Sequence, residues 1–237
     1  MANDGRNGAP AARWWHGSTC VVATAALVLQ FYLVIIGARV LLEGDVPPLP
    51  LRVARFFCYF TVQSNALVAV VTGLLWWAPA RDGPLFRVLR LASVVAIAVT
   101  GVVHYVALRP LLHLTGASWW ADLGLHVAVP ILAVIGWALF GPRPRVDRPS
   151  VGWALLWPIA WLGCTLVVGA LTTWYPYPFL NADRLGYPRV LLTSLVVTAV
   201  FLALIGLVAL VDRYAPARPG DSGTRYPATK RPHSSLP

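Results

Sequence analysis

The second apolar stretch of the chain, residues 56–77, carries polar side chains where a membrane helix would normally carry leucine, valine or alanine. These side chains are Thr61, Gln63, Ser64 and Asn65. On a helix, Thr61, Ser64 and Asn65 share one face, because residues three and four positions apart project to the same side. Polar groups in hydrocarbon need partners, so we expect this face to point into a bundle interior or a cavity.

A histidine with a carboxylate one helical turn before it could activate the Thr61 hydroxyl. Asp122 lies four residues before His126, so on a helix the carboxylate could hold one imidazole nitrogen and leave the other free. A base that is oriented by a third group and faces a hydroxyl is the general arrangement of a catalytic triad. We therefore predict Thr61 and His126 as catalytic residues. We expect the hydroxyl to lie within about 4 Å of an imidazole nitrogen.

Three further polar residues are expected to support this pair: His104, Ser64 and Asn65. Asn65, one turn deeper than the threonine, or Ser64 could donate a hydrogen bond to a developing oxyanion. His104 could take part in the site or pack against the polar face of residues 56–77. Structural alternatives stay open as well. A threonine can bond its own backbone, Ser64 and Asn65 can link helices, and Asp122 can favour a helix N-terminus.

The histidines also raise the question of metal binding. His104, Asp122 and His126, with His113 nearby, could supply ligands. Their spacings do not match a zinc motif beyond the generic four-residue step from Asp122 to His126. Motifs for phosphate or dinucleotide binding are absent from the sequence, as is the serine-hydrolase elbow. We therefore predict neither a metal nor another cofactor.

The elements that must position these residues are membrane helices. Of the 237 residues, 58% are hydrophobic and 12% are charged, against about 25% charged in a soluble protein. Six apolar segments each approach the roughly 20 residues that cross a bilayer. They are residues 21–42, 56–77, 88–108, 123–140, 151–172 and 190–211. We predict an all-α bundle over residues 18–211, with disordered tails at 1–17 and 212–237.

The basic residues predict the orientation of this bundle. The chain has 19 Lys and Arg against 9 Asp and Glu, and most of the basic residues fall in the two tails and in the second and fourth connections. By the positive-inside rule, both termini are expected in the cytoplasm, with the protein in the plasma membrane. Because the arginines are scattered between apolar spans, we interpret the charge as contact with lipid headgroups, and we do not expect nucleic-acid binding. The three cysteines lack paired spacing and are interpreted as small hydrophobes.

This topology predicts that three polar residues share one level of the membrane. At 1.5 Å per residue, Thr61 lies about 8 Å, His104 about 6 Å and His126 about 5 Å below the outer surface. The connection that follows on this outer side, residues 172–181, is dense in aromatic residues and proline. It is typical of an interfacial belt, and it could also cap a cavity with an apolar wall for an acyl chain.

Three motifs in order resemble a known family. They are YFTVQSN at 59–65, LHVAVPI at 125–131 and WYPYPFL at 174–180. Together they resemble the androgen-induced-protein-like (FAR/AIG-type) integral membrane proteins, bacterial branch, over roughly residues 20–210. Animal relatives in that family include threonine hydrolases that cleave fatty-acid esters of hydroxy fatty acids with an intramembrane threonine and histidine. The resemblance implies that Thr61 is the nucleophile and His126 the catalytic histidine.

The leading hypothesis is therefore a threonine-nucleophile lipid hydrolase that acts on a fatty-acyl ester in the outer leaflet. It would contact membrane lipids and need no cofactor. The alternative is a non-enzymatic membrane protein that binds or transports a lipid or a small solute. The sequence does not indicate an oligomeric state.

Overall fold

The structure, a computed structural model, describes residues 4–38, 46–141, 143 and 145–215. Every regular element within them is a helix, and six helices are long and apolar enough to cross a membrane. The six spans are Pro10–Ile35, Phe60–Trp77, Pro84–Leu111, Gly116–Phe140, Arg148–Thr172 and Tyr187–Tyr214. The prediction of an all-α, multi-pass membrane bundle is therefore confirmed.

The spans are built from shorter elements. In chain order these are α1 (Asp4–Ile35), α2 (Leu49–Cys58), α3 (Phe60–Trp77), α4 (Pro84–Val103), η1 (His104–Leu108), η2 (Arg109–Leu111), α5 (Gly116–Leu123), η3 (Gly124–Ala128), α6 (Val129–Phe140), α7 (Arg148–Thr172), η4 (Pro178–Leu180), α8 (Ala182–Leu185) and α9 (Tyr187–Tyr214). The segments η1 and η3 are π-helical, whereas η2 and η4 are 3₁₀-helical.

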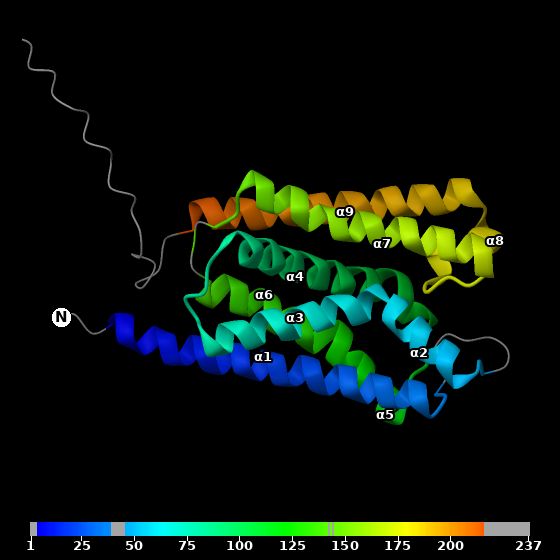
Figure 1. The fold of residues 1–237 in the computed structure, drawn as a ribbon, viewed down its shortest axis with the longest axis horizontal. Coiled ribbons are helices and arrows are strands. Elements are labelled where there is room, and N and C mark those ends of the chain that lie inside the picture. Colours follow the sequence, from blue (N-terminus) through cyan, green and yellow to red (C-terminus); the bar gives the residue numbers. More distant parts are fainter. Residues whose placement is uncertain (1–3, 39–45, 142, 144, 216–237) are drawn as a thin grey trace, which may run out of the picture.

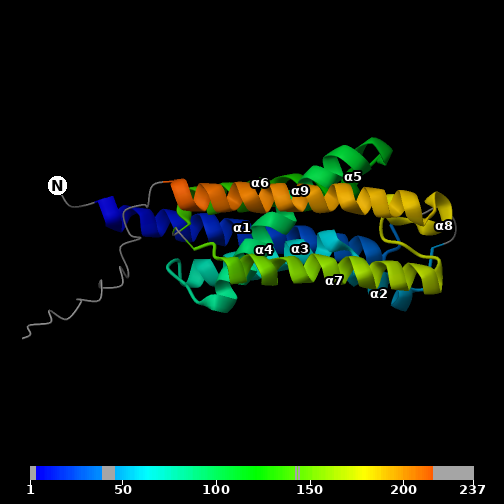
Figure 2. The ribbon, with the colours of Figure 1, turned by 90° about the horizontal axis from the view of Figure 1, so that it is seen from above.

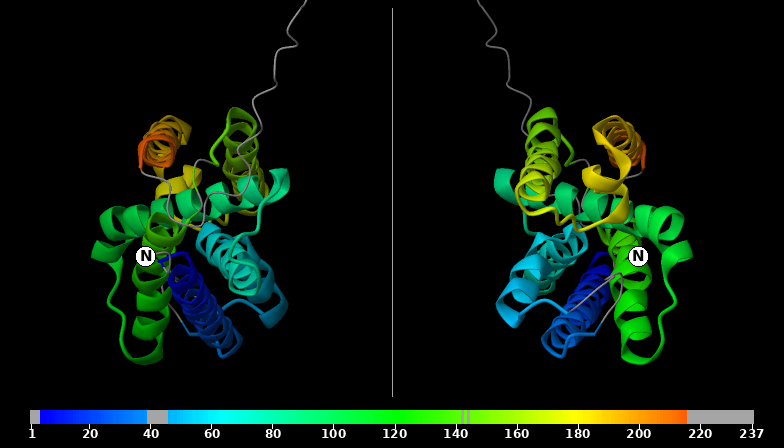
Figure 3. Two further views of the ribbon diagram at one scale, coloured as in Figure 1. Left: turned by 90° about the vertical axis from the view of Figure 1, so that its left-hand side faces the viewer. Right: turned by 90° about the vertical axis from the view of Figure 1, so that its right-hand side faces the viewer.

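Helix α4 lies at the centre of the bundle. Both α7 and α9 pack on one side of it, and α3 and α6 pack on another, with α1 beyond them (Figures 1 and 3). Seen from above, α7 and α9 run alongside each other, and α4 lies behind the gap between them (Figures 1 and 2). In the span that contains α4, 61% of the 18 most apolar consecutive residues are buried, against 17% to 28% in four of the other spans. The apolar side chains of those outer helices are therefore left to face lipid.

The prediction that residues 1–17 form a disordered tail is wrong from Asp4 onward, because α1 begins there. Within the predicted tail, α1 packs on the bundle at Trp15 and His16: the Trp15 indole donates to the Leu132 carbonyl at 3.0 Å, and both rings lie against Phe140. Residues 1–3 fall outside the described residues.

The predicted C-terminal tail begins too early for a similar reason. Asp212 belongs to the last turns of α9 and is 4% exposed. Its carboxylate accepts hydrogen bonds from the backbone N–H groups of Arg145 and Val146, at 2.7 and 2.8 Å. Residues 216–237 of that predicted tail lie outside the described part of the chain.

Several predicted boundaries also change. The connection before the second span contains the helix α2, and the span itself is interrupted at Tyr59. The fourth span begins at Gly116, seven residues before the predicted start at 123.

The first and last described residues lie at the same end of the bundle, whereas α2, α5 and α8 lie at the other (Figure 1). An even number of crossings requires this placement.

Candidate functional site

The N-terminus of α3 is buried in the bundle, because the chain breaks between α2 and α3. Tyr59 has extended backbone, with φ −70° and ψ 127°, and separates the two helices. Thr61 is therefore the second residue of α3, and its backbone N–H is among the donors that a helix start leaves without an intrahelical acceptor. The positive end of the helix dipole also falls here, where it favours a negative charge. The predicted continuous helix over residues 56–77 did not include this feature.

Two side chains satisfy the carbonyls that the break sets free. The Trp161 indole donates to the Cys58 carbonyl at 2.9 Å, and the Gln63 side-chain amide donates to the Phe57 carbonyl at 2.9 Å. Unpaired backbone groups are costly inside a membrane, so these two bonds stabilise the irregular segment. They also account for Gln63, whose role the sequence did not indicate.

Thr61, His126 and Asp122 form one hydrogen-bonded series. The Thr61 hydroxyl lies 3.3 Å from His126 Nε2, and His126 Nδ1 lies 2.9 Å from Asp122 Oδ1. If Nδ1 carries the proton and donates it to the carboxylate, Nε2 is left as the acceptor for the Thr61 hydroxyl. The expected separation of about 4 Å or less is therefore confirmed.

Both histidines lie in π-helical segments. His104 opens η1, and His126 lies at the centre of η3. Pro130 follows His126 by four residues, so it cannot donate to the His126 carbonyl and its ring crowds that carbonyl. Pro110 stands in the same relation to Val106. Widened π-helical turns redirect side chains and occur often at functional sites. Here they bring two imidazoles to one point.

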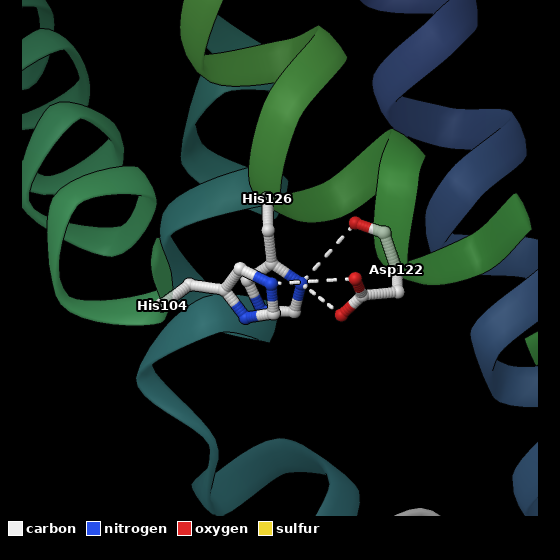
Figure 4. A group of neighbouring side chains, drawn as sticks. All are labelled: His104, Asp122 and His126. Atoms are coloured by element: carbon white, nitrogen blue, oxygen red, sulfur yellow. Dashed lines mark hydrogen bonds and ion pairs between the residues drawn. The ribbon is translucent and has the colours of Figure 1, made fainter. Parts of the chain in front are cut away.

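His104 completes a compact group with His126 and Asp122 (Figure 4). Its ring stacks on that of His126, with centroids 3.9 Å apart and planes 11° apart. Its Nε2 lies 3.3 Å from Asp122 Oδ2, although neither ring nitrogen has a partner in hydrogen-bond geometry among the described residues. The helices can approach this closely because residue 101 is glycine: a Cβ there would lie 3.2 Å from the Pro130 side chain.

Ser64 and Asn65 lie behind Thr61. The Ser64 hydroxyl donates to the Thr61 carbonyl at 3.1 Å and lies 3.0 Å from the Thr100 hydroxyl. The Asn65 amide donates to the carbonyls of Thr61 and Leu125, at 2.9 and 3.1 Å. Both side chains are fully buried. The Ser64 and Asn65 donors are thus engaged with backbone carbonyls, and Asn65 links α3 to η3.

Tyr177 is the site residue that sequence reasoning missed. Its hydroxyl accepts a hydrogen bond from the Thr61 N–H at 3.1 Å and lies 3.1 Å from the Thr61 hydroxyl. Burial raises the pKa of Tyr177 to about 12, so the phenol keeps its proton and stays a donor. The signal was present in the aromatic connection at residues 172–181, which was interpreted as a belt or an apolar wall.

Two cavities meet at this group. One, of about 170 Å³, lies between α4, α7 and α9 and is almost wholly apolar. The other, of about 140 Å³, is more polar and is bounded by α1, α2 and the start of the fourth span, with Asp122 and His126 in its wall. The residues that line both are Thr61, His104, Leu108 and Tyr177. A molecule placed across the two cavities would therefore pass the Thr61 hydroxyl.

The same group has the composition of a metal site. The ligand atoms of His104, Asp122 and His126 all lie within 4.8 Å of one another, and His113 is not part of the group.

Comparison with known proteins adds no assignment: no family model matches the chain, and no curated protein or solved structure matches it.

Proposed function

We propose that this protein is a membrane-embedded hydrolase of lipid esters that uses Thr61 as its nucleophile. The observation that carries the proposal is the series from the Thr61 hydroxyl to His126 Nε2 at 3.3 Å and from His126 Nδ1 to Asp122 at 2.9 Å. It joins a hydroxyl, a base and an orienting carboxylate in the order that nucleophilic catalysis needs.

In the acylation step, the Thr61 oxygen attacks the ester carbonyl carbon while His126 Nε2 takes the hydroxyl proton. The oxyanion that forms lies at the positive end of α3, and the Tyr177 hydroxyl can donate to it. The C–O bond to the alcohol then breaks, and His126 returns the proton to the departing oxygen. The products are a free alcohol and an acyl group on Thr61.

In the deacylation step, water attacks the acyl carbon and gives one proton to His126 Nε2. The bond between the acyl carbon and the Thr61 oxygen breaks, and the proton returns to that oxygen. A carboxylic acid leaves, and the enzyme is restored. Every atom comes from the ester and one water molecule, so the reaction requires no cofactor.

The surroundings support a lipid substrate. The larger cavity suits an acyl chain, because its wall is apolar and includes Phe60, Trp161 and Phe201. The smaller, more polar cavity suits the alcohol part of the ester. The resemblance to threonine hydrolases of fatty-acid esters favours the same class. With cytoplasmic termini, the site would lie in the outer leaflet, since it lies away from the end of the bundle that holds the first and last described residues.

A fluorophosphonate probe with an alkyl chain tests the proposal. In detergent, the wild type should be labelled, and both Thr61→Ala and His126→Ala should lose the label. His113→Ala is a matched histidine control and should be labelled like the wild type. Equal labelling of the wild type and Thr61→Ala would remove Thr61 as the nucleophile and favour lipid binding without turnover.

A further inference from the structure

We propose that His104, Asp122 and His126 form a binding site for a divalent transition-metal ion, and that zinc suits it best. Two imidazole nitrogens and one carboxylate oxygen are a donor set that zinc prefers, and a three-residue set leaves one coordination position open. Sequence spacing did not predict this site, because His104 comes from the third span whereas the other two ligands come from the fourth.

His104 provides an observation that the catalytic series does not explain. It is 2% exposed, yet neither of its ring nitrogens is in hydrogen-bond geometry with a described residue. A buried imidazole without such partners is costly. The Thr61–His126–Asp122 series does not require His104, so catalysis by threonine does not explain it. A metal ion bound to His104 Nε2 would give this buried ring a partner and so explain its position.

The Asp122 carboxylate lies near enough to each imidazole to share an ion with it. His104 Nε2 lies 3.3 Å from Asp122 Oδ2, and His126 Nδ1 lies 2.9 Å from Asp122 Oδ1. Two ligands about 2.1 Å from zinc at a tetrahedral angle are separated by about 3.4 Å. Figure 4 shows both rings presenting a nitrogen toward the carboxylate from the same side. The rings are stacked, so a shared ion requires them to rotate until their lone pairs converge. The smaller cavity, which both rings line, lies beside them.

Metal binding would change what His126 can do, a consequence that rests on the proposed function. With the metal on Nδ1, the single proton of the neutral ring lies on Nε2. Nε2 then donates a hydrogen bond to the Thr61 hydroxyl oxygen, whereas in the metal-free form Nε2 accepts a hydrogen bond from that hydroxyl. The metal-bound protein therefore lacks the base that Thr61 needs. Zinc would act as a reversible inhibitor of ester hydrolysis.

Cobalt is the probe for the site, because Co²⁺ in a low-coordinate nitrogen and oxygen environment absorbs visible light. The full-length protein, purified free of metal in detergent, should bind one Co²⁺ per chain, and Zn²⁺ should displace it. His104→Ala and Asp122→Asn should each weaken binding by at least about 10-fold. Thr61→Ala and His113→Ala should bind as the wild type does. Absence of one-to-one binding, or equal affinity in His104→Ala, would overturn the site.

A measurement on the wild type keeps the test valid if His104→Ala does not fold. X-ray absorption of the zinc-loaded protein should show scattering from two imidazoles, and a spectrum without imidazole scattering would overturn the site. The two proposals fail differently. Cobalt binding in a protein that hydrolyses no ester would sustain the site and contradict the hydrolase. Hydrolysis that depends on Thr61 but is indifferent to Zn²⁺ would contradict the inhibition.

Discussion

The two ends of the bundle use similar charged groups in opposite ways. At the end that holds the first and last described residues, Arg87 makes two hydrogen bonds of 2.8 Å to Asp82 and lies 3.4 Å from Asp147. The Arg87 and Asp82 side chains are about a third exposed. Toward the other end, Asp122 and the two imidazoles are 2% to 15% exposed.

Because of this difference in burial, we expect the exposed pair and the buried group to have different roles. Exposed pairs are solvated with or without their partners, so each contributes little to folding. Buried carboxylates and imidazoles lose hydration, and their interactions with one another are correspondingly stronger. A chain that keeps such a group inside hydrocarbon has a functional site as its default explanation.

The largest effect is expected from removing the base. His126→Ala should lower ester hydrolysis by at least about 10³-fold, because the Thr61 hydroxyl loses its proton acceptor. Turnover of a short-chain fluorogenic ester and of a long-chain ester, measured in detergent, checks this. His113→Ala should keep wild-type turnover. A loss under 10-fold in a folded His126→Ala variant would contradict the assigned base.

The same substitution at both ends compares the two regions directly. Asp122→Asn should lower hydrolysis by about 10² to 10⁴-fold, because an amide can stabilise the wrong imidazole tautomer. Asp82→Asn should leave hydrolysis at the wild-type level, since the ion pairs of Asp82 with Arg87 and Arg145 lie at the opposite end of the bundle. Similar rates for the two variants would show that Asp122 does not orient His126.

A smaller loss is expected when the phenol is removed. Tyr177→Phe should lower kcat by about 10²-fold through loss of a donor to the oxyanion. Substrate KM should change little, because the aromatic ring stays in the cavity wall. Because burial raises the pKa of Tyr177 to about 12, its titration should not limit the rate below about pH 10. An unchanged kcat in Tyr177→Phe would remove the hydroxyl from the reaction.

Asp212, a buried carboxylate near the C-terminal end of α9, should matter for folding alone. Asp212→Ala leaves the N–H groups of Arg145 and Val146 without their acceptor. We expect a loss of about 2 kcal/mol in unfolding free energy, seen as a lower melting temperature in detergent. Hydrolysis per folded molecule should not change. A large activity loss at full stability would connect this end to the site.

The exposed ion pair should give the smallest effect. Arg87→Gln should cost about 0.5 kcal/mol of stability. The Arg87 guanidinium holds the pKa of Asp82 below its usual range. A lowered carboxyl pKa stabilises the fold at pH values above the unfolded pKa, and that contribution is lost as the pH falls. The difference between wild type and Arg87→Gln should therefore narrow below about pH 4. Melting curves across this pH range test this explanation. A difference in melting temperature between the wild type and Arg87→Gln that grew as the pH fell would contradict it.

The fold was predictable because its signal is distributed over many residues. Six long apolar runs indicate six crossings whatever the exact bounds, and depth counting brought Thr61, His104 and His126 to one level. The break at Tyr59 was not predictable, because no proline or glycine marks it. The groups that stabilise it include Trp161, which is remote in sequence.

The site followed the same pattern. The four-residue step from Asp122 to His126 is a local signal, and it predicted a contact that the structure contains. The proximity of Tyr177 to Thr61 depends on how the connection at residues 172–181 folds back over α3. The stacking of His104 on His126 depends on two π-helical turns. Neither arrangement leaves a periodic pattern that sequence reasoning could detect.

The most direct test of the central claim is to detect an acyl group on Thr61. The wild type is mixed with a long-chain ester, quenched in acid within a turnover and digested for mass spectrometry. We expect an acyl mass increment on the peptide that contains Thr61, localised to that residue. With an activated ester, acylation should be faster than deacylation, so the acyl group on Thr61 should accumulate. Hydrolysis that continues while the Thr61 peptide stays unmodified, or an acyl group found on another residue, would contradict the account.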